Sequence, residues 1–175
     1  MTHFLRGITL LASLLLLGAC SPKYDWREIH AGRDAYVIAF PAKPSNETRD
    51  TRLAGQTVSM TMSSTQVDGV TFAVASASMP DAAQAQAALP LMKATLVSNI
   101  GGKIKQESAP HMNQGQALQI EAAGSQTQHG TPQPIVIHAR FIADKQRVYQ
   151  LVVMGPASRI VRDSIDTFFT SFKTE

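Results

Sequence analysis

The sequence has a single cysteine, Cys20, among its 175 residues. A chain with one cysteine forms no internal disulfide, so an exported domain of this kind has to be stable through packing alone. Charged side chains make up only 17% of the sequence, and the formal net charge is +3. Lysine and arginine are dispersed along the chain, with no run longer than the spaced pair Lys103 and Lys105. This pattern lacks the basic stripe typical of proteins that bind nucleic acid.

An apolar run extends from Gly7 to Leu17 and follows a short head that carries Arg6. The run is too short to span a bilayer as a retained helix. A charged head, a short apolar core and small residues after it form the pattern of a secretory signal peptide. We therefore expect residues 1–19 to be a signal peptide that is cleaved.

The three residues before Cys20 are Leu17, Gly18 and Ala19. A leucine, two small residues and a cysteine in this order resemble the bacterial lipoprotein signal, in which a dedicated peptidase cuts before the cysteine. The resemblance implies a diacylglycerol on the Cys20 thiol and an N-acyl chain such as palmitate. Several chains anchor stably, because each buried methylene contributes about 0.8 kcal/mol. The alternative is that Cys20 only lies beside an ordinary signal-peptide cut at Ala19.

The residue after the cysteine is Ser21 and not aspartate. By resemblance to enterobacterial sorting rules, this favours the outer membrane, facing the periplasm, over the inner membrane. Residues 20–34 predict a lipidated N-terminus and a short tether, because this segment is polar with scattered aromatic residues. A dozen extended residues reach roughly 40 Å at most, so the domain is held near the bilayer. Trp26 has two interpretations: it rests at the lipid interface, or it starts an edge strand that packs on the domain.

Residues 35–175 predict a single domain, since their number suits one compact core. Alternating apolar residues predict strands at 36–40, 56–65 and 70–78. The first ends at a proline, and a polar stretch at 45–52 separates it from the second. Asp68 and Gly69 form the strongest hairpin signal in the chain and join the second strand to the third.

A helix is expected after Asp81, which suits an N-cap position and has Gln84 in the capping-box position. Pro90 predicts a kink or a restart of this helix, because proline lacks the amide donor and clashes with the preceding turn. Gly101 and Gly102 predict its end.

The C-terminal part predicts four strands, a polar loop and a closing helix. The last two strands are apolar on both faces, which predicts central positions in a sheet. The closing helix begins at Ala157 and is expected to carry exposed ion pairs between Arg159 and Asp163 and between Arg162 and Asp166. The strands are expected at 103–108, 116–123, 135–143 and 148–154, and the polar loop at 124–134.

This order of elements predicts an α+β fold, with an antiparallel sheet flanked by helices. Four segments resemble bacterial proteins of the PsbP-like class: Tyr-x-Ile-x-Phe-Pro at 36–41, Gly-Gly at 101–102, Arg-Val-Tyr-Gln-Leu-Val-Val at 147–153 and Phe-Phe-Thr-Ser-Phe-Lys at 168–173. The class includes photosystem-associated proteins, a nuclear-transport accessory factor and bacterial lipoproteins. The resemblance implies an antiparallel sheet sandwiched by helices and a binding or assembly role. It implies no site residue, because members share no catalytic residues.

Motifs for catalysis and cofactor binding are missing. The sequence has no Gly-x-Ser-x-Gly string, no phosphate loop and no dinucleotide fingerprint. Its histidines do not have the spacing of metal ligands. A soft copper site at His111 and Met112, or at Met60 and Met62, is the weaker interpretation, because methionines at alternate strand positions fill gaps in a core. We expect neither a metal nor a cofactor other than the covalent lipid.

His138 and Arg140 fall on one face of a predicted strand, and with Gln150 across the hairpin they are candidates for a polar pocket that takes an anion. A solvated or helix-covered face is the other interpretation. We expect a non-catalytic, membrane-anchored lipoprotein of the bacterial envelope that binds or assembles with an envelope protein. The alternative is a small-molecule carrier or enzyme with a pocket between sheet and helix. The sequence gives no indication of the oligomeric state.

Overall fold

The computed structural model describes residues 23–112, 115–128 and 130–175. These residues form two antiparallel sheets and two α-helices, as the expected α+β class requires. The elements in chain order are β1 (Arg27–Ala31), β2 (Tyr36–Phe40), β3 (Ser45–Leu53), β4 (Gln56–Val67), β5 (Val70–Ser78), α2 (Ala82–Asn99), β6 (Lys103–Ser108), β7 (Gln116–Gln128), β8 (Thr131–Asp144), β9 (Arg147–Gly155), the 3-10 helix η1 (Ala157–Arg159), α3 (Arg162–Ser171) and β10 (Lys173–Thr174).

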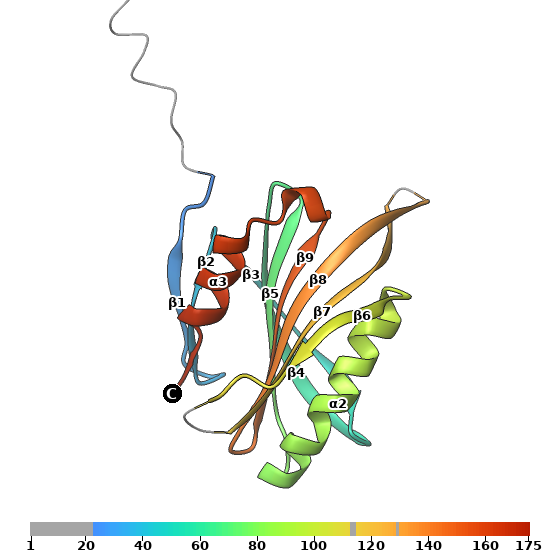
Figure 1. Cartoon of the computed structure of the whole chain (residues 1–175). Helices are drawn as coiled ribbons and strands as arrows, with labels where there is room; N and C mark the ends of the chain where they lie inside the picture. Colours follow the sequence, from blue (N-terminus) through green and yellow to red (C-terminus); the bar gives the residue numbers. More distant parts are fainter. Residues whose placement is uncertain (1–22, 113–114, 129) are drawn as a thin grey trace, which may run out of the picture.

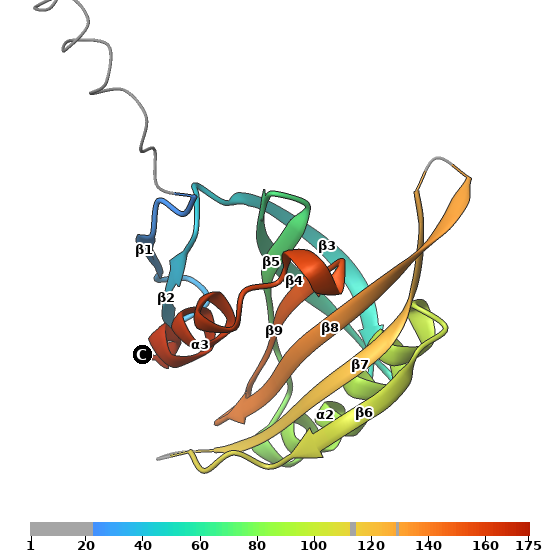
Figure 2. The same ribbon diagram turned by 45° about the horizontal axis from the view of Figure 1, so that its top comes forward.

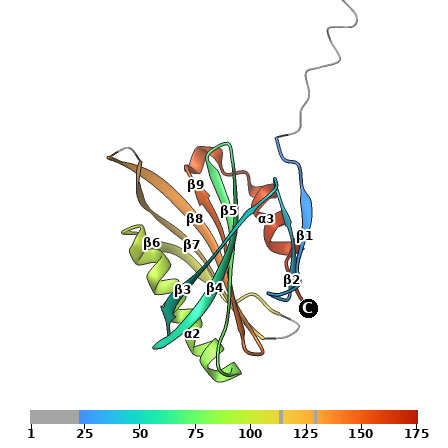
Figure 3. The ribbon, with the colours of Figure 1, turned by 180° about the vertical axis from the view of Figure 1, so that it is seen from behind.

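The large sheet has seven strands in the order β3-β4-β5-β9-β8-β7-β6, and the small sheet has the order β1-β2-β10. The apolar strands β8 and β9 are central, as predicted. Helix α2 lies on one face of the large sheet, whereas α3 and the small sheet lie on the other (Figures 1 and 3). The domain is therefore layered, with an apolar core on each side of the large sheet.

The core under α3 is rich in aromatic rings. Phe168 of α3 is fully buried, and its ring centroid lies 5.4 Å from those of both Phe40 and Phe72. Phe40 belongs to β2 and Phe72 to β5, so one ring contacts the small sheet and the large sheet at once. Edge-to-face pairs of this kind contribute about 0.5–1.5 kcal/mol each beyond the burial of their area. Phe168 thus joins three elements.

The predicted hairpin turn at Asp68 and Gly69 is confirmed. Both residues have positive φ, 51° and 74°, as a two-residue turn of type I′ requires. Ala54 and Gly55 make a similar turn between β3 and β4, with φ of 49° and 81°. These two turns fix the register of the β3-β4-β5 meander.

Helix α2 begins and ends where the sequence predicts. The Asp81 carboxylate accepts a hydrogen bond from the Gln84 backbone amide at 2.7 Å, and the Gln84 side chain donates to the same carboxylate at 3.1 Å. At the other end, the Gly102 amide bonds to the Val97 carbonyl, and Gly101 has φ of 53°. Of the kink or restart expected at Pro90, the restart is wrong. Pro90 lies inside one continuous helix and is exposed, so solvent reaches the carbonyl that lacks its donor.

Two segments expected to be irregular are strands. The polar stretch 45–52 forms most of β3, an edge strand whose residues are almost all exposed. The loop expected at 124–134 is also wrong, because β7 and β8 continue through it with regular pairing from Gly124 and Ile135 to Gln128 and Thr131. Figure 2 shows this hairpin projecting beyond the neighbouring strands. Both segments lack apolar alternation because neither face of the strand is buried.

The segment expected to be a tether contains a strand. β1 pairs with β2 from Arg27 to Ala31, so this part of residues 20–34 belongs to the folded domain. Trp26 packs edge-on against Phe72 with centroids 6.2 Å apart, which favours the second interpretation of this residue. β10, which pairs with β2 through Lys173 and Thr174, is a further strand that the sequence pattern did not indicate.

The closing helix is shorter than predicted. Residues 157–159 form η1, and α3 starts only at Arg162. The expected pair of Arg162 with Asp166 forms at 3.4 Å. The expected pair of Arg159 with Asp163 is wrong: Arg159 lies before α3 and approaches Asp68 at 3.8 Å. Within the described ranges, no helix has the length and apolar character needed to cross a membrane.

Candidate functional site

The predicted pocket residues His138 and Arg140 lie on the face of β8 that α3 covers. Their partners across β7 are Glu121 and Gln119, respectively. The four side chains therefore form two rows beside α3, at the edge of the aromatic core.

Arg140 is engaged by three groups. Its Nε donates to the side-chain oxygen of Gln119 at 2.9 Å, and one terminal nitrogen donates to the Phe169 carbonyl at 3.0 Å. The guanidinium carbon lies 4.9 Å from the centre of the Phe169 ring. Phe169 is in the last turn of α3, where carbonyls lack partners within the helix and a cation is favourable. Arg140 thus caps the C-terminal end of α3 and ties it to the sheet.

His138 is half-buried, and burial lowers the pKa of its imidazole. Glu121 opposes this shift, since its carboxylate lies 3.8 Å from Nδ1 of His138. Arg162 also lowers the pKa, and Asp166 raises it. The net effect is a pKa below the ordinary value of 6.5, so the imidazole is mainly neutral at pH 7. The arrangement places two arginines and two carboxylates around one neutral histidine.

The hollow between these residues and α3 has a volume of about 110 Å³. Pockets for small organic ligands are usually about 300–1,000 Å³. The hollow therefore has room for a few water molecules or a small ion. Its charges balance, because the charges of Arg140 and Arg162 are offset by Glu121 and Asp166, so it does not favour an anion strongly.

Gln150, the third predicted pocket residue, lies elsewhere. The β8-β9 register pairs Arg140 with Leu151, and Gln150 is opposite Phe141. Its side chain therefore points to the other face of the sheet, where it lines a hollow with Met60, Met92 and Leu96 under α2. The expectation that Gln150 joins His138 and Arg140 is wrong.

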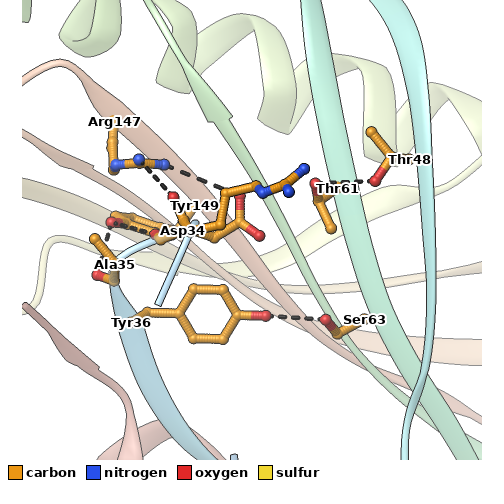
Figure 4. Close-up of polar contacts among 9 residues, drawn as sticks. Asp34, Ala35, Tyr36, Thr48, Thr61, Ser63, Arg147 and Tyr149 are labelled. Carbon is orange, nitrogen blue, oxygen red and sulfur yellow. Dashed lines mark hydrogen bonds and ion pairs between the residues drawn. The ribbon is translucent and has the colours of Figure 1, made fainter. Parts of the chain in front are cut away.

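A second polar cluster holds the turn between β1 and β2 (Figure 4). The Tyr149 hydroxyl of β9 lies 3.1 Å from both the Asp34 and the Ala35 carbonyl and donates its proton between them. Arg147 donates to the Arg33 carbonyl at 2.8 Å and lies 4.0 Å from the Asp34 carboxylate. Ala35 has a φ of 52°, so these bonds hold a turn that an alanine rarely adopts.

A third contact in Figure 4 joins the Tyr36 hydroxyl to the Ser63 hydroxyl at 3.0 Å. Both residues are buried, and their bond links the small sheet to β4. Burial raises the pKa of Tyr36, and it raises that of Tyr149 to about 12. These phenols therefore stay neutral under ordinary conditions, which suits a structural role.

The remaining predicted residues give no further site. Among the described residues, no three histidine, cysteine, aspartate or glutamate side chains gather as metal ligands. Met60 packs at the margin of the α2 core, and Met112 at the margin of the α3 core. His111 and Met112 line an open hollow next to the C-terminal residues. Cys20 and the signal residues Leu17, Gly18 and Ala19 lie outside the described residues.

The residues that neighbour His138 and Arg140 were not identified from the sequence. Gln119 and Glu121 alternate along β7 as His138 and Arg140 do along β8, and this shared alternation was the available signal. The α3 residues Arg162 and Asp166 were identified as a pair but not as neighbours of His138. The role of Tyr149 had no local signal, since its partners are more than a hundred residues away.

Replacing Arg140 with alanine should lower the free energy of unfolding by about 2–3 kcal/mol, because two charge-assisted hydrogen bonds are lost and the Phe169 carbonyl loses its partner. Urea denaturation measures the change. Arg162→Ala is the matched control: its side chain is 79% exposed, so we expect a change within about 0.5 kcal/mol. Equal losses in the two variants would contradict the capping role.

Tyr149→Phe should lower the free energy of unfolding at neutral pH by about 1–2 kcal/mol, because two carbonyls lose their shared donor. The folded pKa of about 12 lies above the value of 10 in an unfolded chain. The unfolded state therefore deprotonates first, and the contribution of the neutral phenol, full below pH 10, is lost between pH 10 and 12. Between pH 10 and 12, the Tyr149→Phe variant should therefore lose less stability than the unchanged protein does.

Thr48→Val is the control for Tyr149→Phe, because it removes an exposed hydroxyl that bonds Thr61 at 3.2 Å and keeps the branched shape. We expect little change in stability and an unaltered dependence on pH. A Tyr149→Phe variant that unfolds like the control at every pH would refute the conclusion that the Tyr149 hydroxyl stabilises the β1-β2 turn.

Comparison with known proteins supports the fold alone. No protein-family model matches the chain, and no curated protein matches its sequence. The structure is similar to the solution structure of cyanobacterial PsbP (CyanoP) from Synechocystis sp. PCC 6803, with 12% sequence identity and a TM-score of 0.56 over 91% of this chain and 99% of that chain. It also matches LpqN of Mycobacterium tuberculosis, which is involved in cell envelope biogenesis, with 14% identity and a TM-score of 0.39 over 86% of this chain and 91% of that chain. The similarity to CyanoP covers nearly the whole of both chains, and the protein therefore has a PsbP-like fold.

Proposed function

We propose that the protein is a non-catalytic lipoprotein, anchored at the outer membrane through Cys20, that binds or assembles with another envelope protein. The anchor is a proposal from the sequence Leu17-Gly18-Ala19-Cys20. The PsbP-like fold is compatible with a binding role, since the resemblance drawn from the sequence implies binding or assembly rather than a shared catalytic site.

The observation that carries the non-catalytic part is the engagement of Arg140. Its guanidinium bonds the Gln119 side chain and the Phe169 carbonyl, so the cation best placed for chemistry holds α3 to the sheet. The second polar cluster also holds backbone in place, because Tyr149 and Arg147 donate hydrogen bonds to carbonyls of the β1-β2 turn. Side chains committed to backbone carbonyls are poor nucleophiles, bases or ligand-binding groups. We therefore place the function on the exposed surface.

Small-molecule binding is the second candidate, and the hollow beside His138 favours it. The space of about 110 Å³ is lined by Arg162 and Ser108 as well as His138. A small polar species that accepts and donates hydrogen bonds suits this lining better than a simple anion, because the charges around the hollow balance. Its small volume makes it a weaker proposal than partner binding.

Cys20→Ala should abolish the incorporation of radiolabelled palmitate that the unchanged protein shows in growing cells. The reason is that the cysteine thiol is the group that receives the diacylglycerol, and N-acylation follows cleavage before this cysteine. Ser21→Ala is the matched control, since it leaves the cleavage residues and the thiol intact, and it should still be labelled. An unchanged protein that incorporates no label, or a Cys20→Ala variant labelled as strongly as the unchanged protein, would show that the anchor is wrong.

Crosslinking in intact cells separates the two candidate functions. The full-length protein should capture one envelope protein reproducibly, with crosslinks that map to residues 35–175. The control carries residues 1–22 joined to an unrelated folded domain, so it shares the anchor and the location. Capture no greater than in this control, together with a small molecule released when the purified protein is denatured, would refute partner binding and favour the second candidate.

A further inference from the structure

The N-terminal segment of the described chain is fixed to one end of the large sheet. The Lys23 ammonium lies 3.0 Å from the carboxylate of Asp68, in the turn between β4 and β5. Tyr24 and Trp26 pack on Phe72 with centroid distances of 6.3 and 6.2 Å. These contacts hold the start of the domain beside the β4-β5 turn.

Few residues separate this point from the proposed lipid. Cys20 is three positions before Lys23, and an extended chain covers at most about 3.6 Å per residue. An acylated Cys20 would therefore lie within roughly 11 Å of Lys23, whatever conformation the intervening residues adopt. The connection is too short for the domain to turn its other end to the bilayer.

Other exposed segments lie at the same end of the sheet. η1 follows the end of β9, and Arg159 of η1 approaches the Asp68 carboxylate at 3.8 Å. The hairpin of β7 and β8 extends past the last β8-β9 pair, which joins Val136 to Gly155, and projects on this side (Figures 1 and 2). We call this end, made of Lys23–Trp26, the β4-β5 turn, η1 and the strand parts 125–128 and 131–134, the anchor end.

The anchor end suits the headgroup region of a membrane. Two exposed cations, Lys23 and Arg159, share the carboxylate of Asp68. The other carboxylate here, that of Asp25, is paired with the adjoining Arg27, so one positive charge remains for anionic lipid. The projecting strand parts 125–128 and 131–134 contain no charged residue, so contact with headgroups removes no ion from water. Val161, just after η1, is 42% exposed and adds apolar surface.

We propose that the anchor end rests directly on the lipid headgroups, so that the β1-β2 and β8-β9 turns at the opposite end face away from the membrane. This inference rests on the proposed lipid anchor and adds the orientation of the domain. The nine residues of β5 separate the two ends by roughly 30 Å, since a strand rises about 3.3 Å per residue. The opposite end is then the surface available to a partner.

Quenching by labelled lipid tests the orientation. Ser158→Cys in η1 and Gln146→Cys in the β8-β9 turn each add one free thiol at an exposed polar residue, because Cys20 is acylated. The lipidated proteins carry a fluorophore on that thiol and are reconstituted in phosphatidylethanolamine and phosphatidylglycerol vesicles that contain a nitroxide headgroup lipid. The probe at 158 should be quenched several-fold more than the probe at 146.

A variant with a longer linker between Cys20 and Lys23 provides the control. Inserting about 20 glycine and serine residues between Ser21 and Pro22 gives a flexible span of roughly 25 Å. The insertion should abolish most of the difference between the two probes while the protein still sediments with vesicles. Undiminished quenching at 158 in this variant would overturn the argument that the short connection sets the orientation.

The outcomes separate this inference from the proposed function. A protein that sediments with vesicles but shows equal quenching at the two positions has its anchor and lacks the orientation, which refutes the inference alone. A protein that does not sediment with vesicles lacks the anchor, which refutes the proposed function and the inference together.

Discussion

The packing of Phe168 between Phe40 and Phe72 is the contact on which the arrangement of layers depends. The small sheet is short and has few backbone bonds of its own, because β1 and β2 have five residues each and β10 has two. It stays on the large sheet through aromatic contacts with α3 and β5. These contacts also set the position of the N-terminal segment, since Trp26 directly precedes β1.

The polar groups in the interior are placed to complete this packing. Arg140 satisfies a carbonyl at the end of α3, and Tyr149 satisfies the β1-β2 turn. Both interactions bring a side chain of the large sheet to backbone that packs on it, and leaving such backbone groups unpaired would be costly. Polar residues that look like a site in the sequence therefore stabilise junctions between elements. Function is then expected on the outside of the domain and at the membrane attachment proposed for Cys20.

Most of the elements that the sequence predicted have one face or both faces buried, although β6 was predicted and is exposed along its whole length. The register of β4 and β5, the central place of β8 and β9, and the caps of α2 all follow from local patterns. β3 and the outer part of the β7-β8 hairpin were missed because neither face is buried there, which removes the alternation. The placement of Gln150 was an error of register: a two-residue turn pairs Asp144 with Arg147, hence Arg140 with Leu151, and the sequence contained this information. The link between Arg140 and Phe169 depends on tertiary packing and had no local signal.

The proposed envelope location and the proposed orientation of the domain both depend on the modification proposed at Cys20. Mass spectrometry of the N-terminal peptide of the mature protein, purified from membranes, tests this most directly. We expect a chain that starts at Cys20 and carries the added mass of a diacylglycerol and an N-acyl chain. A mature chain that starts at another residue, or an unmodified Cys20 thiol, would contradict it.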